Sequence, residues 1–320
     1  MEAAFHIESI PIYGRVFLSP MANFSDSPYR KLCRRFGAAF SFCEFVPAET
    51  IAVRDPDYLS MLRFEEEERP LIFQLFGNNC DTLAEAARVA MEYQPDVIDL
   101  NMGCSVQQIA GNGSGAALLR TPLLAGQMIE RLRKTVPVPV TAKIRLGWDD
   151  SSRNYLEVAR ILQESGVAMV SVHGRTKAQA YTGTADWSAI AEVKANARVP
   201  VLGVGDVLNH SDGLDRIRKW GVDGVLIGRN AAGNPWVFKG MDRSLVPPEE
   251  ILGVMLEHFR DMLRFYGERG CILFRKHAAR YVRGFEGADD LRAKLLQTAT
   301  PEDFETNVMR FIANASAPIL

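Results

Sequence analysis

The sequence predicts an α/β protein, a (β/α)8 TIM barrel followed by a small all-helical C-terminal domain. Short apolar, β-branched runs that end in turn residues are typical of strands, and eight of them occur before Gly240. Helical patterns separate most of these runs, and strands that alternate with helices form a parallel sheet. Eight such units within about 230 residues match a closed barrel, which typically needs about 250 residues.

The predicted strands are, in order, residues 15–20, 40–45, 71–76, 97–102, 139–145, 169–173, 200–204 and 224–228. The helices predicted between them cover residues 82–93, 125–134, 153–164, 185–195 and 211–220. We expect Asp81 to cap the first of these helices and Asn209 or Ser211 the last, because short polar side chains satisfy the free N–H groups of a first helical turn.

An open, doubly wound sheet is the alternative fold. It would place a Gly-x-Gly-x-x-Gly turn directly after a strand. The glycines of the loop 111–115 have a different spacing and lie several residues beyond their strand. Gly203 and Gly205 are followed by Leu208 where a third glycine would stand. The barrel is therefore favoured.

The strand pattern stops after Gly240. The run 247–250, Pro-Pro-Glu-Glu, is typical of a helix start, because proline fits the first helical position and acidic groups suit the first turn. Further helices are predicted at residues 251–266, 273–283, 289–297 and 301–313. We expect residues 1–242 to form the barrel domain and residues 243–320 the helical domain.

Composition excludes several classes of protein. The 320 residues are 47% hydrophobic, which allows a sizeable core, but no apolar run approaches the roughly 18 residues of a membrane span. The N-terminus lacks a basic stretch before an apolar core, so we expect no secretory signal. Five scattered cysteines without a CxxC pair argue against a disulfide framework and against a metal site. They predict a cytoplasmic location, where thiols stay reduced. A net charge of −2 leaves any nucleic-acid binding to a local patch.

Cys104 follows the fourth predicted strand, and the active sites of barrels lie at such strand ends. A thiol at this place is either a small buried filler or a proton donor that faces a ligand. The preceding Asn101 and Gly103, together with the glycine-rich loop 111–115, favour the proton donor.

Two glycine turns end the seventh and eighth predicted strands, Gly205-Asp206 and Gly228-Arg229. Barrels commonly bind a phosphate at these two loops. Glycine lets backbone N–H groups approach the phosphate, and Arg229 adds positive charge. The alternative is a pair of tight turns at the barrel rim.

Lys143 lies inside an apolar strand, where its charge is costly to bury without an anionic or electron-rich partner such as a reduced flavin ring. Gln74 can donate and accept hydrogen bonds at a ring edge. His173 ends the sixth strand, where we expect a functional rather than a structural role. Arg145 is either a functional residue or a rim residue that forms an ion pair. These parts fit an FMN barrel, in which the flavin passes hydride to one carbon of a double bond and Cys104 protonates its neighbour as a general acid.

Motifs along nearly the whole chain resemble the tRNA-dihydrouridine synthases, nearest to their bacterial B-type branch. They occur in the family's order at residues 19–22, 74–77, 99–104, 112–119, 143–148, 173–176, 181–187 and 275–277. The resemblance implies an enzyme that uses FMN and NADPH, or NADH, to reduce the C5–C6 double bond of particular uridines in tRNA. Hydride would reach C6, and Cys104 would protonate C5.

The resemblance also implies roles for other residues. The flavin would be held by Pro20, Met21, Gln74, Lys143, His173, Gly205, Asp206, Gly228 and Arg229. The substrate contacts on the barrel would be Asn101, Arg145 and Arg175. The helical domain would bind the tRNA.

Residues 269–283 contain five basic residues and no acidic one. The tRNA contacts predicted there are Arg275, Lys276, Arg280 and Arg283. The last three fall at i, i+4 and i+7, on one face of a helix, with Phe274 and Tyr281 as nearby aromatic surface. Phosphate contacts from such a face weaken with salt. The alternative is a solvated helix face.

Three positions depart from the family's usual pattern. Ser105 stands where a proline commonly follows the cysteine, which predicts a looser turn around the thiol. Val204 replaces an asparagine, which removes an expected polar contact with the flavin, and Asn23 replaces a glycine near the flavin. Because Cys104 is retained, we still expect an active enzyme.

Two other functions stay open. An FMN barrel that reduces a free pyrimidine or another small molecule would not need the basic helix, so charge reversal at Lys276 and Arg280 would leave its activity intact. A non-catalytic tRNA-binding protein on a degenerate barrel would be indifferent to Cys104→Ala. We expect the protein to be a monomer.

Overall fold

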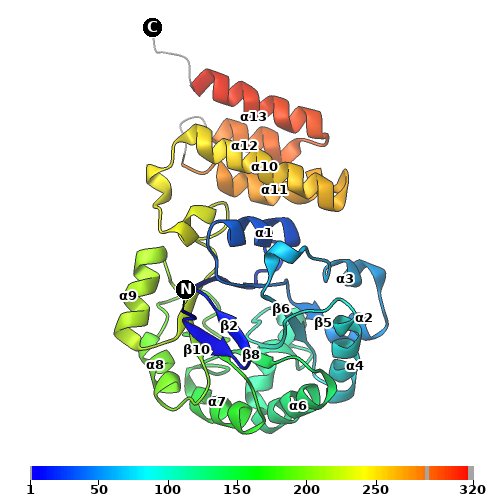
Figure 1. Ribbon diagram of the computed structural model, residues 1–320, viewed down its shortest axis with the longest axis vertical. Coiled ribbons are helices and arrows are strands. Elements are labelled where there is room, and N and C mark those ends of the chain that lie inside the picture. The colour runs from blue at the N-terminus through cyan, green and yellow to red at the C-terminus, as the bar shows by residue number, and fades with distance from the viewer. Residues whose placement is uncertain (1, 285–287, 316–320) are drawn as a thin grey trace.

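The computed structural model describes residues 2–284 and 288–315, and its centre is a closed parallel barrel (Figure 1). The eight strands are, in barrel order, β3 (Val16–Leu18), β4 (Ser41–Phe42), β6 (Leu71–Phe76), β7 (Val97–Met102), β8 (Val140–Arg145), β9 (Val170–His173), β10 (Val201–Val204) and β11 (Gly224–Ile227). Pairing of β11 with β3 and of β4 with β6 closes the ring. The short strand β5 (Val46–Pro47) extends the second strand position by pairing with the end of β6.

Helices surround the barrel. The main ones are α1 (Ser27–Arg35), α4 (Cys80–Met91), α6 (Pro122–Thr135), α7 (Tyr155–Glu164), α8 (Trp187–Ala195) and α9 (His210–Trp220). Shorter helices are α2 (Ala48–Ala52), α3 (Pro56–Ser60) and α5 (Gln107–Ala110). Single 3-10 turns are η1 (Glu66–Glu68), η2 (Gly115–Arg120), η3 (Asp150–Ser152), η4 (Pro235–Lys239) and η5 (Arg243–Leu245). The predicted (β/α)8 architecture is confirmed.

The helix caps follow the expected chemistry with one correction. Asn209 caps α9, because its side-chain oxygen accepts a hydrogen bond from the Asp212 N–H at 2.9 Å. The prediction of Asp81 as the cap of α4 is wrong. The helix begins two residues earlier than predicted, at Cys80, and Asn79 accepts from the backbone N–H groups of Asp81 and Thr82, both at 3.0 Å.

An N-terminal hairpin that the sequence did not predict covers the end of the barrel at which the strands begin. Its strands β1 (Phe5–Ile7) and β2 (Ile10–Ile12) pair antiparallel. Ile7 and Ile12 are buried against apolar side chains at the amino-terminal ends of the barrel strands, among them Phe40. The hairpin therefore leaves the opposite, carboxyl rim as the open end.

Four helices follow the barrel: α10 (Pro248–Tyr266), α11 (Arg269–Tyr281), α12 (Ala288–Gln297) and α13 (Pro301–Ala315). They stack beyond α1 at one side of the barrel (Figure 1), and α10 packs against α1. Their core is aromatic, with the rings of Phe259 and Phe304 stacked at 4.0 Å between centroids. Among the described residues, no helix is long and apolar enough to cross a membrane.

The structure corrects two details of the basic helix. Phe274 and Tyr281 are fully buried, so they offer no aromatic surface to a partner. The helix α11 ends at Tyr281, so Arg283 lies beyond it and does not continue the helical face of Lys276 and Arg280.

Candidate active site

Polar side chains gather near the carboxyl ends of β6, β7, β8 and β9, at matching heights in the sheet. Neighbouring strands pair Gln74 with Asp99, Asn101 with Lys143, and Arg145 with His173. Because the pairing register fixes these heights, four strands deliver six polar residues to one rim of the barrel. All except Lys143 are buried.

Asn101 holds the turn that carries Cys104. Its Oδ1 accepts hydrogen bonds from the backbone N–H groups of Gly103 at 3.0 Å and Cys104 at 2.9 Å. Its Nδ2 donates to Gln74 Oε1 at 2.8 Å. The turn around the thiol is thus fixed by a buried amide, although Ser105 stands where a proline was expected.

The glycine-rich loop packs onto the same turn. The Ala116 N–H donates to the Cys104 carbonyl at 3.1 Å, and a Cβ at Gly115 would lie only 3.1 Å from the Cys104 Cβ. Cys104 is half-buried, and burial raises the pKa of its thiol above the ordinary value of 9.0. The thiol therefore keeps its proton at neutral pH, as a general acid requires.

Lys143 of β8 pairs in register with Asn101, the residue that holds this turn. Within the described residues, no side chain or carbonyl forms a hydrogen bond or ion pair with its ammonium. Burial, aided by the neighbouring charge of Arg145, lowers the pKa of Lys143 to about 8. An ammonium held at this cost fits an anionic or electron-rich ligand.

Arg145 ties the Cys104 turn to the loop after β9. The guanidinium is buried and donates to the carbonyls of Gly103 at 2.8 Å, Thr176 at 2.9 Å and Ala180 at 2.8 Å. Its partners in the described chain are carbonyls, so the rim ion pair considered for it does not form there. Its cationic end lies 5.7 Å from the ring centre of Tyr181.

Arg175 and Asp206, both predicted as site residues, bind each other. Arg175 is 2% exposed, and its Nη2 lies 2.8 Å from each carboxylate oxygen of Asp206. The guanidinium also donates to the carbonyls of Thr182 and Gly183, at 2.9 and 2.6 Å. The pair joins the loops after β9 and β10, so its ion pair orders the rim around any ligand.

The two glycine turns differ in what they leave open. At Gly205 the backbone has φ +128°, and a Cβ would lie 2.6 Å from the Ala185 Cβ and 3.2 Å from His173 Cδ2. At Gly228 a Cβ would meet only Met21 Sδ and Ser19 Cβ, both at 3.7 Å. The chain thus requires glycine at position 205 for its own packing. At position 228 an added side chain would make only ordinary contacts, so the missing side chain leaves room beside Met21 and Ser19.

Charged and neutral groups border this room. Arg229 is exposed, lies 3.9 Å from Asp206 and covers the Tyr181 ring at 4.9 Å. Burial, together with the positive charges of Lys143 and Arg145, lowers the pKa of His173 well below its usual value. His173 is therefore neutral and can accept or donate one hydrogen bond at each ring nitrogen. A flavin phosphate beside Arg229 and a flavin ring beside Lys143 and His173 fit these residues.

Two departures from the family pattern have a physical account. Asn23 has φ +63°, in the left-handed region that glycine adopts freely and asparagine tolerates better than most residues. Its N–H donates to a carboxylate oxygen of Glu44. Val204 is buried in the apolar group inside the barrel with Leu202 and Leu226.

The basic residues of α11 divide into two groups. Arg275 donates to the Thr298 carbonyl at 3.0 and 2.7 Å and so caps the end of α12. Arg280 is exposed, with its guanidinium 5.9 Å from the Phe24 ring centre, and Lys276 is partly exposed. Arg280 and Lys276 are therefore better placed than Arg275 for an external anion.

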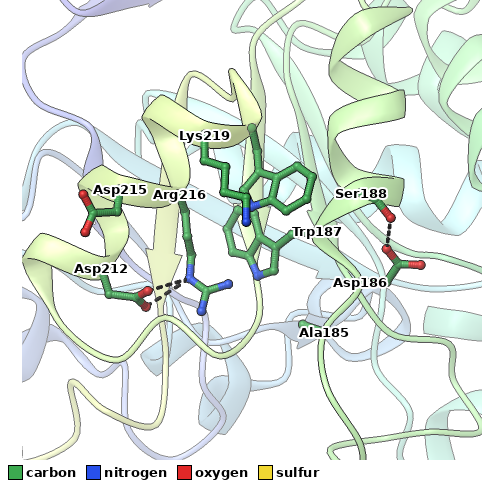
Figure 2. A pocket seen from close by; sticks show the side chains of 9 residues that line it. Ala185, Asp186, Trp187, Ser188, Asp212, Asp215, Arg216 and Lys219 are labelled. Atoms are coloured by element: carbon green, nitrogen blue, oxygen red, sulfur yellow. Dashed lines mark hydrogen bonds and ion pairs between the residues drawn. The ribbon is translucent and has the colours of Figure 1, made fainter.

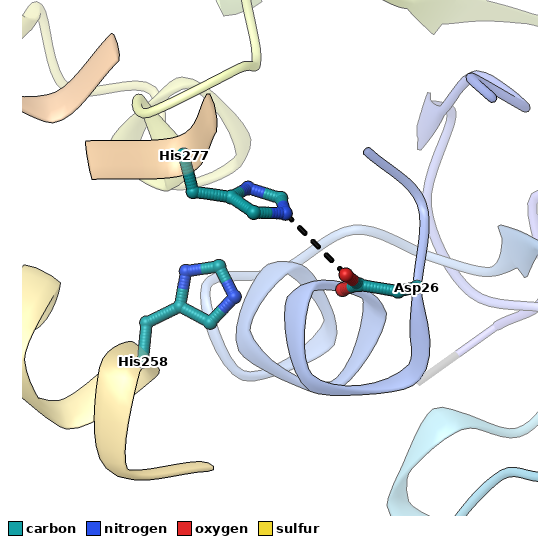
Figure 3. Close-up of side chains that lie close together, drawn as sticks. All are labelled: Asp26, His258 and His277. Atoms are coloured by element: carbon teal, nitrogen blue, oxygen red, sulfur yellow. Dashed lines mark hydrogen bonds and ion pairs between the residues drawn. The ribbon is translucent and has the colours of Figure 1, made fainter. Parts of the chain in front are cut away.

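A buried cluster that the sequence did not indicate joins α1 to the C-terminal helices (Figure 3). His277 Nε2 on α11 lies 3.4 Å from Asp26 Oδ2 at the start of α1. His258 Nδ1 on α10 lies 3.2 Å from the Tyr281 hydroxyl. Burial raises the pKa of Asp26, but His277, His258 and Lys276 together more than offset this, so the pKa is lowered. The contact fastens α11 to the barrel. Asp26, His258 and His277 are side chains of the kind that bind metals, so the absence of a metal site stays a prediction.

A surface hollow of about 460 Å³ lies between α8 and α9 (Figure 2). Trp187, Arg216 and Trp220 are among the residues that line it, and none of the predicted site residues does. Asp212 holds Arg216 through two contacts of 3.0 Å. The hollow is separate from the polar rim that carries Cys104.

Known proteins similar to this chain agree with the motifs. The family model described as dihydrouridine synthase (Dus) matches residues 17–316. The tRNA-dihydrouridine synthase B of Pseudomonas aeruginosa is 35% identical over 309 residues, covering 94% of this chain and 93% of the relative. A probable tRNA-dihydrouridine synthase of Rhizobium leguminosarum bv. phaseoli is 40% identical over 280 residues, covering 87% and 88%.

Solved structures share the fold at low identity. A 2-naphthoyl-CoA reductase complex superimposes with a TM-score of 0.58 at 11% identity, covering 73% of this chain and 51% of the other. Histamine dehydrogenase from Rhizobium sp. 4-9 gives 0.57 at 14% identity, covering 86% and 50%. By its family match and its relatives, this chain belongs to the dihydrouridine synthase family of flavin-dependent oxidoreductases.

Proposed function

We propose that this chain reduces the C5–C6 double bond of specific uridines in tRNA to dihydrouridine, with FMN as the flavin and NADPH, or NADH, as the reductant. The observation that carries the proposal is the half-buried Cys104 thiol, whose raised pKa keeps it protonated on a turn fixed by Asn101. Its neighbour Lys143 is an unpartnered cation on the same rim. A protonated thiol beside a cation suits a reduction that needs one proton.

When bound, FMN supplies hydride for C6 of the uracil ring. We assign the residues that would hold it to two groups. The ring contacts are Pro20, Met21, Gln74, Lys143 and His173, and the phosphate contacts are Gly205, Asp206, Gly228 and Arg229. The open space at Gly228 and the exposed guanidinium of Arg229 support the second group.

Cys104 would give the proton of its Sγ to C5. Asn101 and Arg145 would form the wall of the uracil pocket, because both hold the turn that carries this thiol. Arg175 would contribute by ordering the loops above the pocket through Asp206. The uridine must leave its stack to reach this rim, at a cost of a few kcal/mol that is smallest in loops.

We assign tRNA binding to residues 243–320 and flavin chemistry to residues 1–242, in a monomer without a metal. Lys276, Arg280 and Arg283 would contact phosphates, with Arg275 holding the helices together. The buried contact between His277 and Asp26 supports this division, because it fixes the basic helix relative to the barrel.

The proposal is tested by re-oxidation of the flavin. The flavin released from the purified protein is identified by mass, and the reduced holoenzyme is mixed anaerobically with unmodified tRNA or with free uridine. We expect the released flavin to be FMN, and we expect unmodified tRNA to re-oxidise the reduced flavin. Cys80→Ala is a matched control for Cys104→Ala, because Cys80 is the other partly exposed cysteine.

Other outcomes would favour the alternatives. Re-oxidation by free uridine at the rate seen with tRNA would favour a small-molecule reductase. A protein that holds no flavin and binds tRNA equally well with or without Cys104 would favour a binding role.

A further inference from the structure

Asp99 is a fully buried carboxylate in the strand below the Cys104 turn. A buried charge is costly unless it is hydrogen-bonded, and both oxygens of Asp99 are. Oδ1 accepts from the Thr141 hydroxyl at 2.6 Å, and Oδ2 accepts from Gln74 Nε2 at 2.7 Å. The charged and titratable groups that face Asp99 are Lys143 of β8 and the thiol of Cys43 after β4. Burial raises the pKa of Cys43 to about 12, so Lys143 is the charged one.

The carboxylate dictates the direction of a chain of hydrogen bonds. An ionised carboxylate can only accept, so Gln74 must turn its Nε2 toward Asp99. Gln74 Oε1 then faces Asn101, which must turn its Nδ2 toward it, at 2.8 Å. This leaves Asn101 Oδ1 to accept from the N–H groups of Gly103 and Cys104. Each amide orientation follows from the one before it.

The reverse direction fails at the last step. If the group at position 99 donated a proton, Gln74 would present Oε1 to it and Nε2 to Asn101. Asn101 would then accept through Oδ1 and turn Nδ2 toward the Cys104 N–H. Two donors would face each other, and the turn would lose the bonds that hold it.

We propose that Asp99 is a positioning residue, which orients the amides of Gln74 and Asn101 and thereby fixes the Cys104 turn. The sequence pattern alone does not distinguish Asp99 from any other buried strand residue. Its carboxylate acts on Cys104 only through Gln74 and Asn101. The relevance of this role to catalysis rests on the proposed function of Cys104, whereas the positioning of the turn does not.

The test measures the reactivity of Cys104 in the cofactor-free protein. Iodoacetamide alkylates each cysteine, and peptide mass spectrometry follows Cys104 and, as an internal control, the partly exposed Cys80. Asn101→Ala, which removes the acceptor outright, sets the upper limit. We expect Asp99→Leu, which removes the acceptor that orients Gln74, to raise the Cys104 rate about three- to tenfold at pH 8, because a freed turn exposes the thiol and brings its pKa down. The Cys80 rate should stay unchanged.

Thr141 provides a second, milder pair of variants. Thr141→Val removes the donor to Asp99, whereas Thr141→Ser keeps it. We expect the valine variant to raise the Cys104 rate and the serine variant to match the wild type. These variants keep the inference testable if Asp99→Leu does not fold.

Activity supplies the link to the reaction. In dihydrouridine formation, Asp99→Leu should lower kcat with little change in the KM for tRNA. An unchanged Cys104 alkylation rate in both Asp99→Leu and Thr141→Val, beside a raised rate in Asn101→Ala, would overturn the positioning role. A wild-type protein that makes no dihydrouridine but shows the expected alkylation pattern would contradict the proposed function and leave the positioning role standing.

Discussion

Gly205 and Gly228 both end barrel strands, but the structure predicts that one added methyl group changes stability at Gly205 and not at Gly228. Alanine at position 205 would adopt φ +128°, and its Cβ would lie 2.6 Å from another Cβ. A strained backbone costs about 1–3 kcal/mol and overpacking about 1–3 kcal/mol, so Gly205→Ala should destabilise the cofactor-free protein by about 2–6 kcal/mol. Gly228→Ala has only ordinary contacts at 3.7 Å and should change stability by less than about 0.5 kcal/mol.

Flavin binding is where we expect Gly228→Ala to show its effect, because that variant leaves the fold intact. At position 228 the methyl group would occupy the space beside Met21 that we assign to the phosphate. We expect Gly228→Ala to weaken FMN binding at least about tenfold, which is about 1.4 kcal/mol. Urea unfolding followed by circular dichroism measures stability, and titration of the apoprotein with FMN measures affinity. Equal stability of both variants would refute the backbone argument, and unchanged FMN affinity in Gly228→Ala would refute the assigned phosphate seat.

Three further results are expected. Cys104→Ala should lower the rate of dihydrouridine formation by about 10²–10⁴ at unchanged flavin content, as loss of a general acid does; a wild-type rate would exclude this role. Lys276→Glu with Arg280→Glu should raise the KM for tRNA and reduce the slope of log affinity against log salt by about 0.7–0.9 per lost phosphate contact, whereas the exposed Arg160→Glu on α7 should do neither. The folded state holds fewer protons than the unfolded chain between the lowered pKa of Lys143, about 8, and its ordinary 10.5, so the apoprotein should gain stability as pH rises through this window. Lys143→Met should flatten that rise in urea titrations, and an identical slope would contradict the buried ammonium.

The barrel could be predicted because its signals are local. The strands at residues 71–76 and 97–102 coincide with the prediction, since each is a run of buried side chains closed by turn residues. The N-terminal hairpin was missed because the turn that joins its two short strands, Glu8-Ser9, contains no glycine, asparagine or proline to mark it.

Contacts between distant residues explain what the sequence could not supply. Arg175 carries the same charge whether it binds a ligand or Asp206, and only the fold shows that the two are 2.8 Å apart. The same holds for Arg275, whose partner is a carbonyl at the end of another helix. Asp99 lies within the motif at residues 99–104, but its role depends on Thr141 and Gln74 on the flanking strands.

The central claim is most directly tested by position-resolved mapping of dihydrouridine in unmodified tRNA transcripts after incubation with the flavin-loaded protein and NADPH. We predict dihydrouridine at a defined position, formed by the wild type and by Cys80→Ala but lost or nearly lost with Cys104→Ala. A flavin-loaded wild-type protein that leaves every uridine unreduced, or a Cys104→Ala variant that modifies the same position at the wild-type rate, would contradict the account.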